Sequence, residues 1–402
     1  MSSAPVFVSR LVGLMLLAPD GSPVGKIDDV VVAPPGSDSP PAVVGFVAEV
    51  QRRQIFVNAN RVGELDITGA RLYTGTVDLR KFKLRTGELL VRQSFIDQRV
   101  GRESINDVAI RLVAGQSRSW EVAGVSLVST GLLRRRRTGR LTGWEVLNEL
   151  NLFDVSPMAL QVSELREMHP ADAATHMAGL TQEAKDAVVE AMDDEELAEL
   201  LQELPEDQAS ELLESLDVDR AADVLEEMEA DDAADLLAEL PPAEREEMLQ
   251  AMDPEEAEPL RRLLAYLPDT AGGLMNPYPL ILSGNSTVAE ALAHIRDPDI
   301  AAAEAAHVFV CEAPLETPTG AYLGPVGFQR LLREPPYTKL ALCLDDGPEH
   351  VGEEMPIAEI ARRLAAYDVV AVPVVDRQNR LLGAVSVDDV LDHLLPAGWR
   401  RR

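Results

Sequence analysis

The sequence predicts a multidomain chain made of an N-terminal β-barrel-like domain, an all-α superhelical solenoid and a C-terminal pair of α/β domains. Three observations predict this order. The first 130 residues carry short apolar runs separated by turns, the middle carries a helical repeat of twelve residues, and the chain after residue 266 alternates strand and helix patterns. We therefore place the β domain at 1–130, a linker at 131–160, the solenoid at 161–265 and the α/β pair at 266–396, with its halves at 272–335 and 338–396.

Residues 1–130 are rich in Val, Gly and Thr, and turns such as Pro19-Asp20-Gly21 separate their apolar runs, which is typical of a β-rich domain. The sequence Val-Gly-Lys-Ile-Asp-Asp-Val at 24–30 has an echo in Val-Gly-Arg-Glu-Ser-Ile-Asn-Asp-Val at 100–108. Each copy predicts a strand, a tight turn at an Asp and a second strand. These residues resemble the PRC-barrel family. The resemblance implies a binding or assembly module with two repeats, whose ligand the sequence does not identify.

A run of four arginines, Arg134 to Arg137, stands in the linker between the β domain and the helical repeat. Such a run could contact anionic lipid, or the acidic helical repeat itself. The alternative is a solvated linker, because stable membrane binding usually needs a second anchor and the sequence offers none. Together with the basic tail Arg400 to Arg402, the run is a candidate contact for a membrane-associated partner.

The middle of the chain carries apolar residues at an unbroken interval of twelve: Leu180, Met192, Leu204, Leu216, Met228, Leu240, Met252 and Leu264. Within a typical block, such as residues 193–204, the apolar positions are the fifth, eighth, ninth and twelfth, which form the stripe of one short amphipathic helix. Asp or Pro at the start of most blocks supplies a cap or a fixed backbone angle. Because one such helix cannot bury its own stripe, the blocks are expected to stack into a solenoid.

The helical repeat is also strongly acidic. Residues 169–260 hold 31 Asp and Glu against only Lys185, Arg220 and Arg245, a net charge of −28 in a chain whose formal net charge is −31. Such a surface repels nucleic acid and suits divalent cations, which lower the repulsion between carboxylates. We therefore expect no nucleic-acid partner. The alternative for the cation is that the charge is only solvated and keeps the protein in solution.

The C-terminal region predicts two similar α/β units. Strands are expected at 280–282, 307–311, 340–344, 369–375 and 381–386, and helices at 288–295, 357–367 and 387–395. The second half, with Ala-Tyr-Asp-Val-Val-Ala-Val-Pro-Val-Val-Asp at 366–376 and Gly-Ala-Val-Ser-Val-Asp-Asp at 383–389, resembles a CBS domain. Residues 280–332 resemble a degenerate first copy. Paired copies form one module in that family and commonly dimerise, so the resemblance implies a homodimer through the CBS domains.

A further motif, Tyr-Leu-Pro-Asp-Thr-Ala-Gly-Gly-Leu-Met at 266–275, lies where the repeat meets the α/β pair. With the repeat before it and Val-Asp-Asp-Val-Leu-Asp at 387–392 after it, this motif resembles the MgtE magnesium transporter family over residues 160–396. The resemblance implies a cytosolic N domain and CBS pair that sense Mg²⁺ and close onto each other when cations neutralise repelling carboxylates. The chain departs from the family at both ends, with a barrel in front and no pore behind, so it is not expected to conduct magnesium itself.

Carried over position by position, the resemblance implies Mg²⁺ ligands at Asp231 and Asp235 in the repeat and at Asp389 in the second CBS copy. Asp368 and Asp392 match further acidic sites of the family. Asp231 and Asp235 are one helical turn apart on one face. Mg²⁺ keeps several waters and needs only one or two carboxylates from the protein, so weak sites at an acidic interface suit a sensor. The alternative for each residue is a solvated helix charge.

The sequence at 383–389 also has the Gly-x-x-Ser/Thr-x-x-Asp form with which CBS domains hold a ribose and its phosphate. The resemblance implies that Ser386 contacts phosphate and Asp389 the ribose of ATP or another adenine nucleotide. The equivalent stretch of the first copy, 324–330, lacks both the hydroxyl and the carboxylate. At most one nucleotide site per chain is therefore expected, and Asp389 has two candidate ligands.

Several other classes of protein are disfavoured. No apolar run reaches the roughly 20 residues of a membrane-spanning helix, no secretory signal pattern is found, and Cys311 and Cys343 are the only cysteines. We therefore expect a cytoplasmic protein. The six histidines show no metal-ligating spacing, and neither a phosphate loop nor a nucleophile elbow occurs, so an enzyme is not expected.

Two classes of function remain. The first is a magnesium-sensing regulator, whose closure changes its docking to a partner such as a separate membrane transporter. The second is a constitutive protein-interaction scaffold, in which the barrel and solenoid are adaptors and the acidity confers only solubility. Binding of an adenine nucleotide to the CBS module is a further alternative to the first class.

Overall fold

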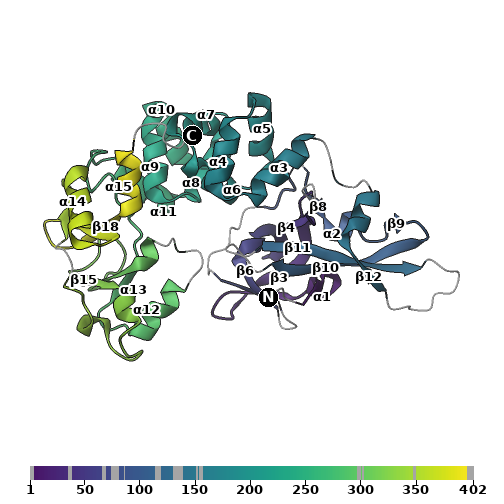
Figure 1. Ribbon diagram of the computed structural model, residues 1–402, viewed down its shortest axis with the longest axis horizontal. Coiled ribbons are helices and arrows are strands. Elements are labelled where there is room, and N and C mark those ends of the chain that lie inside the picture. Colours follow the sequence, from purple (N-terminus) through teal and green to yellow (C-terminus); the bar gives the residue numbers. More distant parts are fainter. Residues whose placement is uncertain are drawn as a thin grey trace. The chain divides into compact units, whose positions relative to one another are not determined.

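The computed structural model describes residues 4–34, 39–65, 69–73, 81–85, 87–113, 119–129, 139–150, 153, 157–296, 300, 303–346 and 350–395. The chain divides into two compact units, which we describe one at a time (Figure 1). The first unit is Met1–His169 with Leu180–Met192, and the second is Pro170–Gly179 with Asp193–Arg402. The arginine runs at 134–137 and 400–402 lie outside the described residues.

A curled sheet forms most of the first unit and confirms the predicted β-barrel-like fold as a half-barrel (Figure 1). Among the described residues it has 12 strands, in the order β1-β10-β11-β4-β3-β2-β7-β6, with β12, β5, β8 and β9 pairing off this path. The strands are β1 (Val6–Phe7), β2 (Met15–Leu17), β3 (Pro23–Val32), β4 (Ala42–Val50), β5 (Arg53–Asn58), β6 (Val62–Leu65), β7 (Gly69–Leu72), β8 (Leu89–Leu90), β9 (Arg99–Val100), β10 (Glu103–Val113), β11 (Ser119–Ser129) and β12 (Arg140–Thr142). Phe46, Phe95 and Trp120 lie in its buried core.

The two echoing segments of the β domain occupy equivalent places in the sheet. Each copy begins with a short helix, α1 (Val8–Leu11) or α2 (Val91–Ser94), and continues into a long hairpin, β3 with β4 or β10 with β11. Asp29 of the first copy accepts hydrogen bonds from the backbone N–H groups of Val30 (2.8 Å) and of Arg92 in the second copy (3.0 Å). Asp107 of the second copy likewise accepts from Ser9 N–H in the first copy, at 3.1 Å. The two copies therefore hold each other reciprocally.

Two helices of the repeat belong to the first unit, α3 (Pro157–Glu167) and α5 (Gln182–Ala191), and the short 3₁₀ helices η1 (Ala59–Arg61) and η2 (Trp144–Leu150) also lie in it. The Ser163 hydroxyl donates a hydrogen bond to the carbonyl of Pro34 at 2.9 Å. The Arg166 guanidinium lies 3.9 Å from the buried Glu88 carboxylate and also donates to the carbonyl of Ala191 at the end of α5. These contacts attach α3 and α5 to the β domain.

The second unit begins with the rest of the helical repeat. Its helices are α4 (Pro170–Ala178), α6 (Asp194–Glu203), α7 (Glu206–Glu214), α8 (Val218–Glu226), α9 (Ala230–Glu239), α10 (Pro242–Ala251) and α11 (Pro254–Leu263). Helices pack against their next-but-one neighbours, so that α4, α6, α8 and α10 form one row and α7, α9 and α11 another. This two-row superhelix confirms the predicted solenoid.

Each block of twelve residues forms one helix with its cap and turn. In the block 193–204, Leu197, Leu200, Leu201 and Leu204 are all buried, as the stripe predicts. Asp193 accepts a hydrogen bond from Glu196 N–H at 2.8 Å, and the Glu196 carboxylate accepts from Asp193 N–H at 3.1 Å, a reciprocal pair that fixes the helix start. The twelfth residue is the C-cap of its helix in α6 and α9 and directly follows the C-cap in α7 and α8, so in these blocks it lies at the turn and not inside the helix.

The C-terminal α/β region consists of two copies of one motif, as predicted. The first copy has β13 (Ile281–Ser283), α12 (Val288–Ile295), η3 (Glu304–Ala306), β14 (His307–Cys311), β15 (Tyr322–Gly327) and α13 (Phe328–Leu331). After η4 (Leu340–Leu342), the second copy has β16 (Val351–Gly352), α14 (Ile357–Tyr367), β17 (Ala371–Val375), β18 (Leu381–Ser386) and α15 (Val387–Leu394). In each copy the first two strands are parallel and the last two antiparallel.

The strand predicted at 340–344 is wrong. Residues Leu340–Leu342 form a 3₁₀ turn, in which Cys343 N–H donates to the Leu340 carbonyl at 2.9 Å. Leu340 and Cys343 are buried there, so a short apolar run reflected burial and not extension. The prediction also missed β15, because Gly324, Pro325 and Gly327 lower its apparent strand propensity.

The junction motif at 266–275 connects the solenoid to the second CBS copy. Ala271 and Gly272 donate backbone hydrogen bonds to the carbonyls of Met355 and Glu353, both at 2.9 Å. A Cβ atom on Gly273 would lie 2.5 Å from the Leu267 carbonyl oxygen, so only glycine fits this turn. Residues 276 and 384 then exchange two backbone hydrogen bonds, of 2.9 and 3.0 Å. The motif is thus a packed connection that holds α9 of the solenoid and α15 of the CBS copy within one unit.

Candidate functional site

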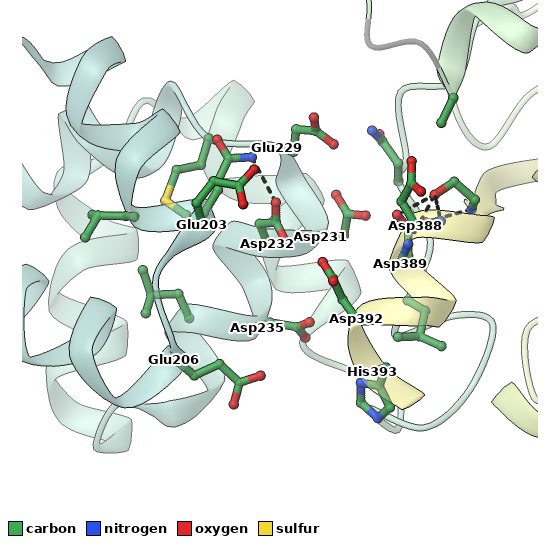
Figure 2. Close-up of a pocket in the computed structure, with 18 of the residues that line it drawn as sticks. Glu203, Glu206, Glu229, Asp231, Asp232, Asp235, Asp388, Asp389, Asp392 and His393 are labelled. Carbon is green, nitrogen blue, oxygen red and sulfur yellow. Dashed lines mark hydrogen bonds between the residues drawn. The ribbon is translucent and has the colours of Figure 1, made fainter. Parts of the chain in front are cut away.

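A candidate site is a cleft of about 730 Å³ in the second unit. The connection between α6 and α7 and helix α9 form one wall, and α15 with neighbouring CBS residues forms the other (Figure 2). The described residues that line it include no Lys or Arg, and twelve are acidic: Glu203, Glu206, Asp207, Glu229, Asp231, Asp232, Asp235, Glu239, Glu304, Asp388, Asp389 and Asp392. The cleft therefore has a strong negative potential.

Helix α9 places Asp231 and Asp235 one turn apart on the face that lines the cleft. Asp231 is only 7% exposed, and its Oδ1 atom has no hydrogen-bond partner. Burial, and then the charges of Asp232 and Asp389, raise the pKa of Asp231 well above its ordinary value. Burial, followed by Asp232 and Glu206, raises the pKa of Asp235 to about 7. A cation in the cleft would relieve both carboxylates.

Helix α15 supplies Asp389 and Asp392 to the opposite wall (Figure 2). The Ser386 hydroxyl accepts hydrogen bonds from the N–H groups of Asp388 and Asp389 and donates to Asp389 Oδ1 at 2.6 Å. Asp389 Oδ2 accepts from Ser386 N–H at 2.7 Å. Although these bonds favour the ionised form, burial raises the pKa of Asp389 above its ordinary value. The helix cap therefore fixes the position of the Asp389 carboxylate, while burial disfavours its ionised form.

The structure brings together most of the residues that the sequence singled out. Asp231, Asp235, Asp389, Asp392 and Ser386 all line the cleft. Asp368 does not line it, and instead ends α14 in a left-handed conformation, with φ 52° and ψ 39°.

Sequence reasoning missed several other lining carboxylates. Asp232 and Asp388 adjoin residues that it named, and their place in the first turns of α9 and α15 could have signalled them. Gln202 of the neighbouring helix donates to Asp232 at 2.9 Å. No sequence signal points to Glu304, because it reaches the cleft from the first CBS copy, where its carboxylate accepts from Asn276 at 2.6 Å.

The donor set of the cleft fits a hard cation such as Mg²⁺. It offers carboxylate oxygens, one of which is buried without a partner, and no thiolate. Within the described ranges, however, no three His, Cys, Asp or Glu side chains lie close enough together to hold one ion. The carboxylates of Asp231, Asp235, Asp389 and Asp392 are instead distributed over two walls, so an ion that keeps its water shell fits better than one stripped of it.

Apolar residues of the CBS pair also line the cleft near Ser386. Ala371 pairs with Ser386 across β17 and β18 and packs in one cluster with Phe309 and Ala384, which suits a base with its ribose. In the first CBS copy the equivalent helix, α13, has Gly327 as its N-cap residue, and no side chain caps it. That copy therefore lacks the hydroxyl and carboxylate, as the sequence indicated.

A second, smaller cleft of about 580 Å³ lies in the β domain. It is lined from both repeats, by Ser9, Asp28 and Asp29 of one and Arg92 and Asp107 of the other. Arg92 pairs with Asp28 at 3.1 Å. The buried carboxylates of Asp29 and Asp107 each accept backbone hydrogen bonds. Because these charges are satisfied internally, this cleft shows no comparable demand for a ligand.

Two family models match the helical repeat and the second CBS copy. Residues 168–269 match the MgtE intracellular N domain, and residues 344–396 match the CBS domain. The magnesium transporter MgtE of Thermus thermophilus is 33% identical over 132 residues, which are 33% of this chain and 28% of that protein. The magnesium transporter MgtE of Enterococcus faecalis is 28% identical over 135 residues, with coverage of 33% and 28%.

Two solved structures are similar in fold. The cytosolic domain of the Mg²⁺ channel MgtE in complex with ATP has 30% sequence identity and a TM-score of 0.53, covering 62% of this chain and 98% of that one. The soluble part of a magnesium transporter has 25% identity and a TM-score of 0.52, covering 59% and 98%.

The fold, the cleft and these comparisons define a helical-repeat domain joined to a CBS module, and neither matched domain belongs to an enzyme family. The two domains are the N domain and CBS pair of the MgtE magnesium transporter family, here preceded by the half-barrel sheet. The match spans about 28% of the length of the curated relatives. Among the described residues, no helix is long and apolar enough to cross a membrane.

Proposed function

We propose that this chain is a magnesium-responsive regulator. Mg²⁺ binds in the acidic cleft between α9 and α15, holds the N domain against the CBS pair, and thereby changes how the chain docks to a partner. The buried Asp231 oxygen without a hydrogen-bond partner is the observation that carries this proposal, because it faces a cleft whose described lining holds no compensating Lys or Arg. A separate membrane transporter is the partner that the MgtE relatives suggest.

The physical basis is repulsion across the cleft. Without cations, the carboxylates of Asp231 and Asp235 oppose those of Asp389 and Asp392, which disfavours the closed arrangement. A divalent cation that binds the closed form better than the open form shifts the population by its difference in affinity. A hydrated Mg²⁺ ion binds the closed form better, because its waters donate hydrogen bonds to carboxylates of both walls. In the open form the walls are apart, and the ion reaches only one of them.

The test is small-angle X-ray scattering of the full chain, titrated with MgCl₂ at constant ionic strength. We expect the radius of gyration to fall with Mg²⁺ and the fall to be lost in Asp389→Ala. At pH 8, above the pKa of about 7 of Asp235, the pair Asp231→Asn with Asp235→Asn should compact the chain without Mg²⁺, since it removes repelling charge from the α9 wall. A constitutive scaffold would show the same radius of gyration under every condition, and that result would reject the sensor.

Adenine nucleotide binding is a second candidate function of the same cleft. The apolar lining beside Ser386 and Asp389 supports it, as does the MgtE cytosolic domain solved in complex with ATP. Calorimetric titration with ATP in the presence and absence of Mg²⁺ tests this candidate, with Ser386→Ala as the variant expected to weaken binding. Binding that is insensitive to this substitution would place the nucleotide elsewhere.

The CBS pair is also proposed to form a homodimer. Its helices α14 and α15 expose apolar side chains, among them Tyr367, Leu391 and Leu394. Such a patch on adjacent helices is typical of an interface between copies. Light scattering after size-exclusion chromatography should give twice the chain mass, and Leu391→Glu with Leu394→Glu should give a monomer. We propose no nucleic-acid partner and no catalytic activity.

A further inference from the structure

The acidic cleft is much larger than one hydrated metal ion. Its volume is about 730 Å³. Six waters of a hydration shell occupy about 180 Å³, taking about 30 Å³ for each water. A single hydrated Mg²⁺ ion therefore fills a minor part of the cleft, and the remaining space is still bounded by carboxylates of both walls, such as Glu206 and Glu304.

The carboxylates are spread along the cleft rather than gathered at one point. Asp388 and Asp389 lie on α15 opposite Asp231, while Asp235 lies farther along α9 (Figure 2). In the described part of the chain no three acidic side chains converge on one position. Positive charge that is distributed in the same way would satisfy more of them than a compact ion can.

The cleft also carries apolar surface between its charges. The partly exposed Pro205 and Met228 line the solenoid side, and the exposed Leu395 lines the CBS side. Apolar side chains offer no ligand atoms to a metal ion, but they stabilise methylene groups that are removed from water. A chain in which ammonium groups alternate with methylene segments matches both kinds of lining.

We propose that the cleft binds a linear polyamine, an organic polycation with ammonium groups separated by methylene segments, in competition with Mg²⁺. One ammonium group donates to the unpartnered Asp231 oxygen, and another donates to the carboxylates of α15. The polyamine therefore bridges the same walls as the metal ion. This inference rests on the cleft being the cation site proposed above, and it adds a ligand of a different chemical class.

Isothermal titration calorimetry of the full chain with spermidine, at fixed ionic strength, tests the inference. Hexaamminecobalt(III) is the matched ligand, because it carries the same charge in a compact form without methylene groups. We expect spermidine to bind about tenfold more tightly, a ratio that burial of about two methylene groups supplies. MgCl₂ should displace it.

The cleft variant is Asp231→Asn with Asp235→Asn, and the matched control is Glu244→Gln with Glu247→Gln. The control removes the same charge from exposed positions of α10, outside the cleft. Circular dichroism checks that both variants fold. The cleft variant should lose about tenfold or more in spermidine affinity, since charged hydrogen bonds are lost, and the control should stay within about twofold because exposed charges contribute little.

The outcomes separate this inference from the proposed function. If Mg²⁺ binds and spermidine does not, the polyamine proposal fails and the magnesium sensor stands. If spermidine binds in the cleft and Mg²⁺ does not, the magnesium sensor and the competition with Mg²⁺ fail, whereas the assignment of the cleft as a polyamine site stands. Equal affinities for spermidine and hexaamminecobalt(III), or equal losses in the cleft variant and its control, would overturn the polyamine proposal, because either result means that charge alone attracts the ligand.

Discussion

Two buried aspartates show how the hydrogen bonding of a single residue separates a structural role from a functional one. Asp29 in the β domain accepts two backbone N–H groups, which connect the two repeats. Asp231 in the solenoid is also deeply buried, but its Oδ1 atom has no partner. Backbone donors satisfy the Asp29 carboxylate and use it to connect the repeats, whereas the unpartnered oxygen of Asp231 remains open to a ligand.

The residue-scale prediction concerns pH and Asp29. Burial is the main cause that raises the pKa of Asp29 above its ordinary 3.8, although its backbone hydrogen bonds oppose the shift. The native state therefore binds a proton more readily than the unfolded state, so Asp29 lowers the stability of the β domain as the pH rises from about 4. Asp29→Asn keeps an oxygen acceptor and should be relatively more stable at pH 7 than at pH 3.5.

Urea denaturation at both pH values, followed by tryptophan fluorescence, measures this difference. Trp120 and Trp144 pack in or against the core of the β domain, so their emission reports its unfolding. A stability difference between Asp29→Asn and the unchanged protein that is independent of pH would contradict the prediction.

At the scale of elements, the start of α15 combines a helix cap with the lining of the candidate cleft. Ser386 and Asp389 form a reciprocal cap, and the same pair lines the cleft. Helix α12 of the first CBS copy has the same kind of cap in Thr287 and Glu290, which do not line the cleft. The cap of α12 is therefore a control for the cap of α15, because it begins a helix in the same way but does not line the cleft.

We predict that Ser386→Ala and Thr287→Ala each lower the free energy of unfolding by about 1 kcal/mol, the usual contribution of an N-cap hydroxyl. Only Ser386→Ala should also weaken adenine nucleotide binding. Urea denaturation measures the first effect and calorimetry the second. Equal effects of both substitutions on nucleotide binding would show that stability alone was being measured.

The junction between the solenoid and the CBS pair gives a second element-scale prediction. Gly273→Ala places a methyl group 2.5 Å from the Leu267 carbonyl oxygen and 3.0 Å from the Pro268 Cα atom, so backbone must move. We expect a loss of roughly 1–3 kcal/mol. Gly352→Ala is the control, because its Cβ atom would meet nothing within 4 Å. Thermal unfolding followed by circular dichroism distinguishes them, and equal melting temperatures would exclude a packing role for the junction.

At the scale of the whole molecule, the sequence was most informative where a pattern repeats. The interval of twelve predicted the solenoid, and the echo in the CBS region predicted two similar α/β units. In the β domain the tight turn predicted at each Asp is wrong, because β3 and β10 each continue through it as one strand with a bulge. A single apolar run did not predict the structure correctly at 340–344, where residues that are buried in a turn have the apolar pattern of a strand. The opposing walls of the cleft come from distant segments of the sequence, and only a family resemblance placed Asp231 opposite Asp389. Periodicity could not supply Glu304, whose position depends on the folding of the first CBS copy.

The division into two units gives the last prediction. A ligand that binds only the second unit stabilises that unit, by about 2.7 kcal/mol at a hundredfold excess over its dissociation constant, and leaves the other unchanged unless both unfold together. The tryptophans are Trp120, Trp144 and Trp399, and Trp399 lies outside the described residues. In Trp399→Phe the emission therefore reports the first unit alone, whereas helical circular dichroism reports mainly the solenoid of the second. We expect Mg²⁺ to raise the transition seen by circular dichroism and to leave the fluorescence transition in place. Equal shifts of the two transitions would mean that the two units unfold cooperatively.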